Sequence, residues 1–322
     1  MSDAGGEPLE AVRRTGLLVP AAPLVVMLSG GRDSVCLLDI AVGLCGADAV
    51  TAFHVNYGLR EQAGTDEEFC RGLCRELGVA LSVEAVTEVP QAGNLQAWAR
   101  DLRYAVGAQL AGRRGADLAA GHTITDQAET VLYRLAVSPG RRALLGMAPR
   151  RGRLVRPLLA AGLTRGDTAA WCRARGLDWV DDASNEGTAY ARSRVRGEVL
   201  AGLAAINPSA EANIARSAAA LRDEAEVLDL VVDTALAGRR EIPLEHLEAL
   251  PAALGRLVAR ELAERATGSP CPRAAGRLPE ILALDRGPGA AALDVGDGAR
   301  ALVEGGVLRF ARSPERSRAG GR

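Results

Sequence analysis

The chain has 322 residues, of which 48% are hydrophobic and 25% charged, and its formal net charge is −1. This length and composition predict a globular protein with one large domain and a smaller one, and they exclude a largely disordered chain. The near-neutral charge excludes a uniformly basic nucleic-acid-binding coat, and six scattered cysteines without a C-x-x-C pair indicate neither a disulfide framework nor a zinc site.

The residues before position 24 show no export or membrane-spanning pattern. Asp3, Glu7 and Glu10 stand where a signal peptide would carry basic residues, and Pro20 and Pro23 interrupt the apolar stretch that follows. We therefore expect a cytoplasmic protein with no membrane partner.

A glycine-containing loop follows the first predicted strand. The apolar run at 24–28 predicts a buried strand, and apolar residues recur at helical spacing from position 35. Between them lies Ser29-Gly30-Gly31-Arg32-Asp33-Ser34. Glycines allow close backbone approach, and the N–H groups at a helix start bind anions, so the segment predicts a phosphate site. The alternative is an ordinary strand-to-helix turn of an α/β protein.

This loop lacks the lysine of a Walker P-loop, because the chain contains no lysine and all 39 basic residues are arginines. The absence of lysine also excludes a pyridoxal Schiff base, a lysyl-nucleotide intermediate and lysine-assisted γ-phosphate transfer. The loop resembles that of the PP-loop ATP pyrophosphatase superfamily. The resemblance implies cleavage of ATP to AMP and pyrophosphate, with Asp33 near the departing pyrophosphate through Mg²⁺.

Strands and helices then alternate along the chain. Strands are predicted at 49–55, 79–86 and 117–121, and helices at 66–77, 95–110 and 126–136. This alternation predicts an α/β fold with a Rossmann-like, doubly wound, mostly parallel sheet. Ligands of such sheets bind at the carboxyl ends of the strands, where the glycine loop, His54 and His122 fall.

A second functional candidate lies at the start of the helix near 126. His122 follows a strand, and Asp126 and Glu129 lie three residues apart on one helical face. One interpretation is a capping box of Thr123 and Asp126. The other is a small acidic pocket for Mg²⁺ or a cationic amine, with His122 near a reacting phosphate.

Arginines are concentrated in two later segments. The first holds no acidic residue, and its arginines are Arg141, Arg142, Arg150, Arg151, Arg153 and Arg156. The second carries Arg192, Arg194 and Arg196 at alternate positions. Either segment can be a solvated surface or a phosphate-binding one.

The remaining pattern predicts a strand at 154–159, a capped helix at 164–176 and a long helix at 207–240. Helices at 250–265 and 273–284 and a hairpin of strands at 293–302 and 306–310 follow. We expect a PP-loop domain at 1–206, a bridging helix at 207–240 and a small helical C-terminal domain at 241–322 that ends in a β-hairpin.

Several motifs in order strengthen the resemblance over residues of about 24–206. After the glycine loop they are His54-Val55-Asn56-x-Gly58-Leu59-Arg60, Ala99-Arg100-x-x-Arg103-Tyr104, Gly121-His122-Thr123-x-x-Asp126-Gln127-Ala128-Glu129-Thr130, Arg156-Pro157-Leu158 and Asp182-x-Ser184-Asn185. Together they resemble the tRNA(Ile)-lysidine synthase family in its compact form.

The resemblance implies an ATP-dependent carbon–nitrogen ligase. Members of that family adenylate the C2 oxygen of the wobble cytidine in a tRNA(Ile) with a CAU anticodon, and free L-lysine then displaces AMP to give lysidine. The implied cofactors are ATP and Mg²⁺, and the implied partners are this tRNA and L-lysine. The resemblance leaves both a monomer and a homodimer open.

The resemblance also assigns roles to individual residues. Ser29, Gly30, Gly31, Arg32, Asp33, Ser34 and His54 would bind the nucleotide, with Asp33 on Mg²⁺. His122 would contact the α-phosphate or the adenylate. Asp126 and Glu129 would bind the lysine ammonium group, and Arg192 the lysine carboxylate or the intermediate. The residues expected to meet tRNA phosphates are Arg100, Arg103, Arg141, Arg142 and Arg196.

Three alternatives use the same loop. A tRNA thiolase of this fold would need reactive or cluster-binding cysteines, commonly a C-x-x-C pair. An ammonia- or glutamine-dependent ligase would need a different acceptor pocket or an amidotransferase partner. A non-catalytic RNA-binding module would not need Asp33 and both serines, Ser29 and Ser34, which are intact.

Overall fold

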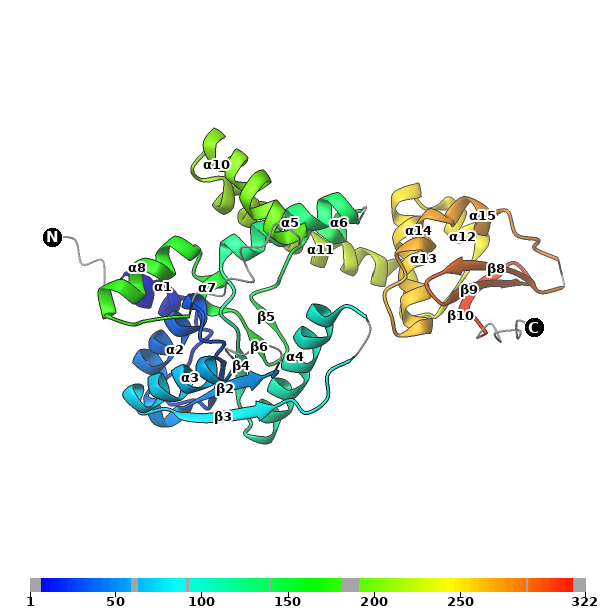
Figure 1. Cartoon of the computed structure of the whole chain (residues 1–322). Coiled ribbons are helices and arrows are strands. Elements are labelled where there is room, and N and C mark those ends of the chain that lie inside the picture. Colours follow the sequence, from blue (N-terminus) through cyan, green and yellow to red (C-terminus); the bar gives the residue numbers. More distant parts are fainter. Residues whose placement is uncertain are drawn as a thin grey trace, which may run out of the picture. The chain divides into compact units, whose positions relative to one another are not determined.

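The computed structural model describes residues 7–58, 63–90, 93–138, 140–180, 191–287 and 289–314. Arg60 and the segment 182–185 lie outside these ranges, as does the side chain of Arg192. The chain divides into two compact units, Met1–Leu221 and Arg222–Arg322 (Figure 1). The division falls within the long helix α11 (Ala210–Leu236). The three-part division expected from the sequence stays a prediction.

The first unit is built on a six-stranded sheet with the order β3-β2-β1-β4-β6-β5. The strands are β1 (Leu24–Met27), β2 (Val50–Asn56), β3 (Ala80–Ala85), β4 (Asp117–Ala119), β5 (Arg150–Arg151) and β6 (Leu154–Val155). All neighbours pair in parallel except β5, which runs antiparallel to β6. The predicted α/β fold with a mostly parallel sheet is confirmed.

Helices cover both faces of this sheet. The helices of the first unit are α1 (Glu7–Arg14), α2 (Arg32–Cys45), α3 (Ala63–Leu77), α4 (Leu95–Arg113), α5 (Ile124–Val137), α6 (Arg141–Leu144), α7 (Pro157–Ala160), α8 (Arg165–Arg175), α9 (Ala191–Arg194) and α10 (Ala201–Ile206). The described residues also form the short 3₁₀ turn η1 (Ala47–Ala49), the π-helix η3 (Val195–Leu200) and the first part of α11, up to Leu221.

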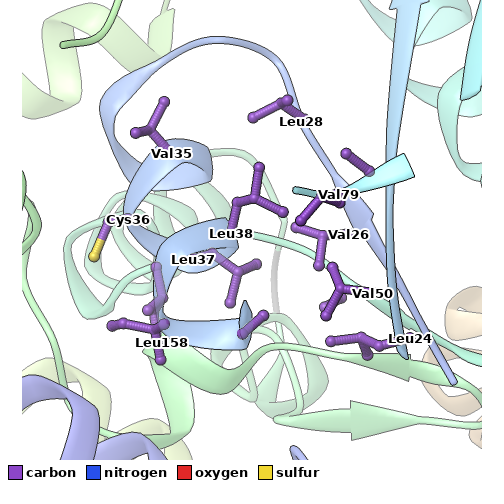
Figure 2. Close-up of a cluster of buried hydrophobic side chains, with 14 of the residues drawn as sticks. Leu24, Val26, Leu28, Val35, Cys36, Leu37, Leu38, Val50, Val79 and Leu158 are labelled. Atoms are coloured by element: carbon purple, nitrogen blue, oxygen red, sulfur yellow. The ribbon is translucent and has the colours of Figure 1, made fainter. Parts of the chain in front are cut away.

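Alternate residues of β1 point into two different cores, as the strand period requires. Val26 packs with α2 and with buried residues of α1, α3 and α8. Figure 2 shows Leu37 and Leu38 of α2 beside Val26 and beside Val50 of β2. Val25 belongs to the opposite core, which α4 covers (Figure 1). Burial on both faces explains why the strand sequence is apolar throughout.

The strand predicted at 154–159 is wrong in its second half. Only Leu154–Val155 is extended, and α7 begins at Pro157. Proline fixes φ near −65° and lacks an N–H, which suits the first position of a helix and ends pairing in a sheet.

The second unit contains the C-terminal part of α11 and a four-stranded antiparallel sheet with the order β7-β10-β9-β8. Its strands are β7 (Glu241–Pro243), β8 (Ala291–Gly296), β9 (Ala299–Glu304) and β10 (Val307–Arg312), and its helices are α12 (Leu244–Ala249), α13 (Ala252–Thr267), α14 (Pro272–Gly276) and α15 (Leu278–Leu282). Val258 and Leu262 of α13 pack with Val303 of β9 and Leu308 of β10 in its core.

Two sequence predictions are wrong in this unit. The strand expected at 293–302 is two strands, β8 and β9, joined at Asp297 and Gly298, both with positive φ. Asp-Gly favours such a tight hairpin turn. The helix expected at 273–284 is interrupted after Gly276, and α15 begins at Leu278 with Pro279 in its first turn, because proline cannot continue a preceding helix.

In the described part of the chain, no helix is both long enough and apolar enough to span a bilayer.

Candidate active site

The loop Ser29–Ser34 connects β1 to α2, as the sequence predicts. Gly30 has φ of +84°, a conformation that favours glycine, and α2 begins at Arg32. The Ser34 hydroxyl donates to the Gly31 carbonyl at 2.7 Å and accepts from the Ser29 backbone N–H at 3.2 Å. Ser34 therefore braces the loop, while the start of α2 offers its dipole to an anion.

A cavity of about 520 Å³ opens beside this loop, at the carboxyl ends of the parallel strands. The predicted site residues that line it are Ser29, Gly31, Arg32, Asp33, Ser34, His54, His122, Asp126, Arg103 and Arg196. Gly121 fixes how the His122 segment meets the loop, because a Cβ there would lie 2.9 Å from the Asp33 carbonyl oxygen. The two motifs separated in sequence therefore meet backbone to backbone.

Asp33 is held from two sides. Its Oδ1 accepts a hydrogen bond from the Thr168 hydroxyl of α8 and lies 3.3 Å from Arg32 Nε. Its Oδ2 lies 3.4 Å from Nε of Arg165, the first residue of α8. Oδ1 is thus held by the Thr168 hydroxyl and by the Arg32 guanidinium, and Oδ2 faces the Arg165 guanidinium at the cavity.

Asp126 forms the capping box and also lines the cavity, while its binding of Mg²⁺ or an amine stays a prediction. It forms a capping box with Thr123: its Oδ2 accepts from the Thr123 backbone N–H at 2.9 Å and from the Thr123 hydroxyl at 3.0 Å. Its Oδ1 faces the cavity and accepts from Arg165 Nη2 at 3.3 Å. Capping therefore uses one carboxylate oxygen and leaves the second for charge recognition.

Glu129 is 4% exposed and forms a two-point ion pair with Arg196 of η3. The hydrogen bond to Glu129, together with the negative charges of Glu129, Asp126 and Asp33, raises the pKa of the Arg196 guanidinium above its ordinary value, although burial opposes this shift. Arg196, expected at tRNA phosphates, lines the cavity in the structure. Glu129 faces this arginine and is not itself part of the cavity wall that the described residues form.

His122 is held in one protonation state by its neighbours. Arg156 Nε donates to Nδ1 at 3.2 Å, and Nε2 lies 3.3 Å from the Tyr104 hydroxyl. Burial, opposed by Asp126 and reinforced by Arg156, lowers the pKa of His122 to about 3. The ring is therefore neutral near pH 7, and because Nδ1 accepts, the proton lies on Nε2 at the cavity.

His54 has a structural anchor as well as a place at the cavity. It is 5% exposed, and its Nδ1 donates to the Leu28 carbonyl of β1 at 2.9 Å. Tyr57 of the same segment also lines the cavity, donates to the Ala99 carbonyl at 2.8 Å and meets Trp98 edge-on at 6.2 Å.

The remaining predicted arginines are distributed differently. Arg100 and Arg103 lie 4.9 and 6.0 Å from the Tyr104 ring centroid, so a cation–π pair holds them beside the cavity. Arg141 donates to the Leu221 carbonyl at 2.9 Å, and Arg142 forms α6 with it. In the acid-free segment, Arg150 pairs with Asp117 of β4 at 2.8 Å.

Sequence reasoning missed Arg165 and Thr168 as site residues. Both belong to a helix start that looks like an ordinary capping motif, with Thr164 as the cap. No local signal marks them, because their relevance depends on α8 packing beside α2 and bringing them to Asp33.

All six cysteines are buried. Burial raises the pKa of Cys70 to about 12 and that of Cys74 to about 11, which keeps these thiols protonated near neutral pH.

Residues 10–203 match a model of an ATP-binding domain described as a PP-loop domain. A tRNA(Ile)-lysidine synthase of Symbiobacterium thermophilum is 36% identical over 332 residues, covering 94% of this chain and 68% of that protein. Those of Pseudomonas aeruginosa and Thermus thermophilus are 39% and 40% identical, covering 63% and 66% of this chain.

The chain spans about half the length of several of these relatives, 47% of the Pseudomonas aeruginosa protein and 42% of the Thermus thermophilus protein. Among solved structures, a U34-tRNA thiolase from Methanococcus maripaludis with its [4Fe-4S] cluster superimposes with a TM-score of 0.57 at 16% identity, over 67% of this chain and 78% of that one. That likeness concerns the fold alone. With the matched PP-loop domain and the relative that aligns along nearly the whole chain, the protein belongs to the tRNA(Ile)-lysidine synthase family of PP-loop proteins.

Proposed function

We propose that the protein ligates free L-lysine to C2 of the wobble cytidine in a tRNA(Ile) with a CAU anticodon, consuming ATP to AMP and pyrophosphate. The observation that carries the proposal is the convergence of the phosphate loop, His122 and Asp126 on one cavity. Family membership supports the same reaction.

The first step is adenylation of the cytidine C2 oxygen. The ring carbonyl carbon is a weak electrophile until its oxygen becomes part of a leaving phosphate, so the enzyme must hold ATP and base together. The start of α2 would hold the phosphates through backbone N–H groups and the Ser29 hydroxyl.

Asp33 would hold Mg²⁺ at this loop. Magnesium sites in ATP-using enzymes need one or two carboxylates together with substrate phosphates and water, and Asp33 meets that requirement with a cavity-facing Oδ2. When bound, the metal would neutralise charge on the departing pyrophosphate.

His122 would act as a hydrogen-bond donor. Its neutral ring with the proton on Nε2 suits an oxygen of the α-phosphate or of the adenylate. A histidine held neutral at pH 7 with Nδ1 occupied by Arg156 is poorly placed to take up a proton from the attacking amine.

The second step is attack of the lysine ε-amine on C2. The N–C2 bond forms, the C2–O bond to the phosphate breaks, AMP leaves and the amine loses a proton. Asp126, with Glu129 behind it, would recognise the lysine ammonium group, and Arg192 its carboxylate or the intermediate. Arg196 joins this group in our proposal, because its guanidinium lies at the cavity beside Glu129.

Arg100, Arg103, Arg141 and Arg142 would contact tRNA phosphates, and the second unit would contribute further tRNA contacts. The thiolase alternative needs reactive cysteines, commonly a C-x-x-C pair. The sequence has no such pair, and Cys70, which lies 3.5 Å from His54 Nδ1, is buried with a raised pKa.

An incorporation assay tests the proposal. The full chain, ATP, Mg²⁺, labelled lysine and tRNA(Ile) with a CAU anticodon are mixed, and wild type is compared with Asp33→Ala. We expect labelled tRNA with stoichiometric AMP for wild type and a loss of at least about a hundredfold for the variant. Absence of label with wild type, or label from sulfide or ammonia instead of lysine, would overturn it.

A further inference from the structure

One guanidinium joins two subsites that the proposed function assigns to different substrates. Arg165 Nε lies 3.4 Å from Asp33 Oδ2 at the phosphate loop. Arg165 Nη2 lies 3.3 Å from Oδ1 of Asp126, the carboxylate that the proposed function gives to lysine. The Arg165 side chain is 27% exposed, so it stands at the boundary between protein and cavity. Its Nε is buried and forms no hydrogen bond with any residue that the structure describes.

The backbone of Arg165 is fixed, whereas its side chain has alternative partners. The Arg165 N–H donates to the Thr125 hydroxyl at 3.2 Å, and Thr125 donates to Glu211 at 2.6 Å. Asp33 is likewise anchored through Oδ1 to Thr168, one turn along α8. The guanidinium contacts can therefore exchange without moving a helix.

The cavity is charge-balanced without substrates. Its carboxylates, with Glu129 behind them, are equal in number to its arginines: the acidic residues of the wall are Asp33, Asp66 and Asp126, and the arginines are Arg32, Arg103, Arg165 and Arg196. A lysine ammonium entering this site must compete with Arg165 for Asp126, and in a partly desolvated site two cations on one carboxylate oxygen repel each other. Bound phosphates would attract Arg165 away from Asp126, because a guanidinium binds phosphate oxygens through two charge-assisted hydrogen bonds.

We propose that Arg165 makes lysine binding depend on bound nucleotide. In the empty site Arg165 occupies Asp126; with ATP present it turns to the phosphates and frees Asp126 Oδ1 for the lysine ammonium. This binding order excludes the lysine amine until ATP is bound and C2 of the cytidine can be made electrophilic. This inference rests on the proposed function and adds a specificity-determining residue to it.

Equilibrium binding of L-lysine to the full chain tests the proposal, titrated with and without α,β-methylene-ATP and Mg²⁺. For wild type we expect the nucleotide to lower the lysine Kd about tenfold or more, within the usual range of coupling between sites. For Arg165→Gln we expect tight lysine binding without nucleotide and a change of less than about threefold on adding it. By reciprocity, lysine should tighten nucleotide binding in wild type by the same factor.

Arg13→Gln is the matched control, because Arg13 also pairs with a carboxylate, Glu10, but on the exposed face of α1. It should behave as wild type. Arg165→Lys keeps the positive charge but cannot contact Asp33 and Asp126 at the same time, so the nucleotide should lower its lysine Kd by an intermediate factor. This variant replaces Arg165→Gln if Arg165→Gln unfolds at a low temperature. Coupling that survives undiminished in both variants, or none in wild type, would overturn the proposal. Absence of lysine binding under every condition, with the tRNA also added, would instead count against the proposed function.

Discussion

Two helices of the first unit begin with the same local motif and use it differently. Helix α5 starts at Thr123 with Asp126 in a capping box, and α8 starts at Thr164 with Asp167 in another. The two starts lie side by side, because the Ile124 N–H donates to the Leu163 carbonyl at 2.9 Å. Only the first box places its carboxylate at the cavity.

The difference comes from the flanking residues. The residue before the cap is His122 in one motif and buried Leu163 in the other. The residue after the cap is Ile124 in the first and Arg165 in the second, and Arg165 reaches across to Asp126. One helix start therefore supplies the carboxylate and the other supplies its cation, so the site is a property of the pair.

Among substitutions at the two helix starts, Asp126→Asn should have the largest effect. Asparagine can still accept the Thr123 hydrogen bonds, but it removes the negative charge that the proposed function gives to the lysine ammonium. We expect the lysine KM to rise about fiftyfold, equivalent to roughly 2.3 kcal/mol, within the range for a charged hydrogen bond. The ATP KM should change less than about threefold, measured by steady-state pyrophosphate release with tRNA. Equal changes in both constants would point to a capping or metal role for Asp126.

The second effect is a pH dependence of stability that we expect from His122. Leu163, which holds the same position before the cap of α8, has no titratable group. Burial lowers the folded-state pKa of His122 from 6.5 to about 3, with Asp126 opposing this shift and Arg156, Arg100 and Arg103 adding to it. Between these values the unfolded chain binds a proton that the folded chain does not, so stability falls as pH decreases. The free energy of unfolding of wild type minus that of His122→Gln should drop by roughly 2 kcal/mol from pH 7 to pH 5.

Denaturant titrations at several pH values measure this difference, and the other titrating groups cancel in the subtraction. Leu163→Ala serves as the control, since its destabilisation should be independent of pH over the same range. A flat difference for His122→Gln would mean that the ring titrates normally in the folded protein.

The sequence predicted the parts of the site that local pattern determines. The strand, glycine loop and helix around Asp33 have a recognisable order, and both His122 and Asp126 follow a strand in a helix-start pattern. The parallel sheet was predictable because apolar strands and amphipathic helices alternate. Each of these depends on neighbours in sequence.

The sequence did not predict which residues the fold brings together. Arg165 and Thr168 lie more than one hundred positions from Asp33, and their contacts depend on α8 packing beside α2. The two-point pairing of Arg196 with Glu129 is equally non-local, which is why alternate arginines at 192–196 could not be sorted by role. In the second unit, the Asp297-Gly298 turn was a local signal that the strand prediction passed over.

The two threonine caps provide a matched pair. Thr123→Ala and Thr164→Ala each remove a hydroxyl that caps a helix, so each should lower the free energy of unfolding by about 1 kcal/mol. Only Thr123→Ala should also raise the lysine KM, because it loosens a carboxylate that faces the cavity. Chemical denaturation and lysine kinetics on both variants give the comparison, and a similar KM change in Thr164→Ala would show that the two boxes are not functionally distinct.

Asp167→Asn should have the smallest effect. The Asp167 carboxylate accepts from the Thr164 backbone N–H and hydroxyl, both at 2.7 Å, and asparagine can preserve these bonds. The loss is the favourable placement of a negative charge in the first turn of α8, worth about 0.5 kcal/mol at low ionic strength and less in salt. Lysine KM should stay at the wild-type value, in contrast to Asp126→Asn. Because Arg165 is the first residue of the same helix and competes with lysine for Asp126, a lowered lysine KM here would mean that fraying of α8 releases Arg165. The position of that guanidinium would then depend on the capping box of its own helix.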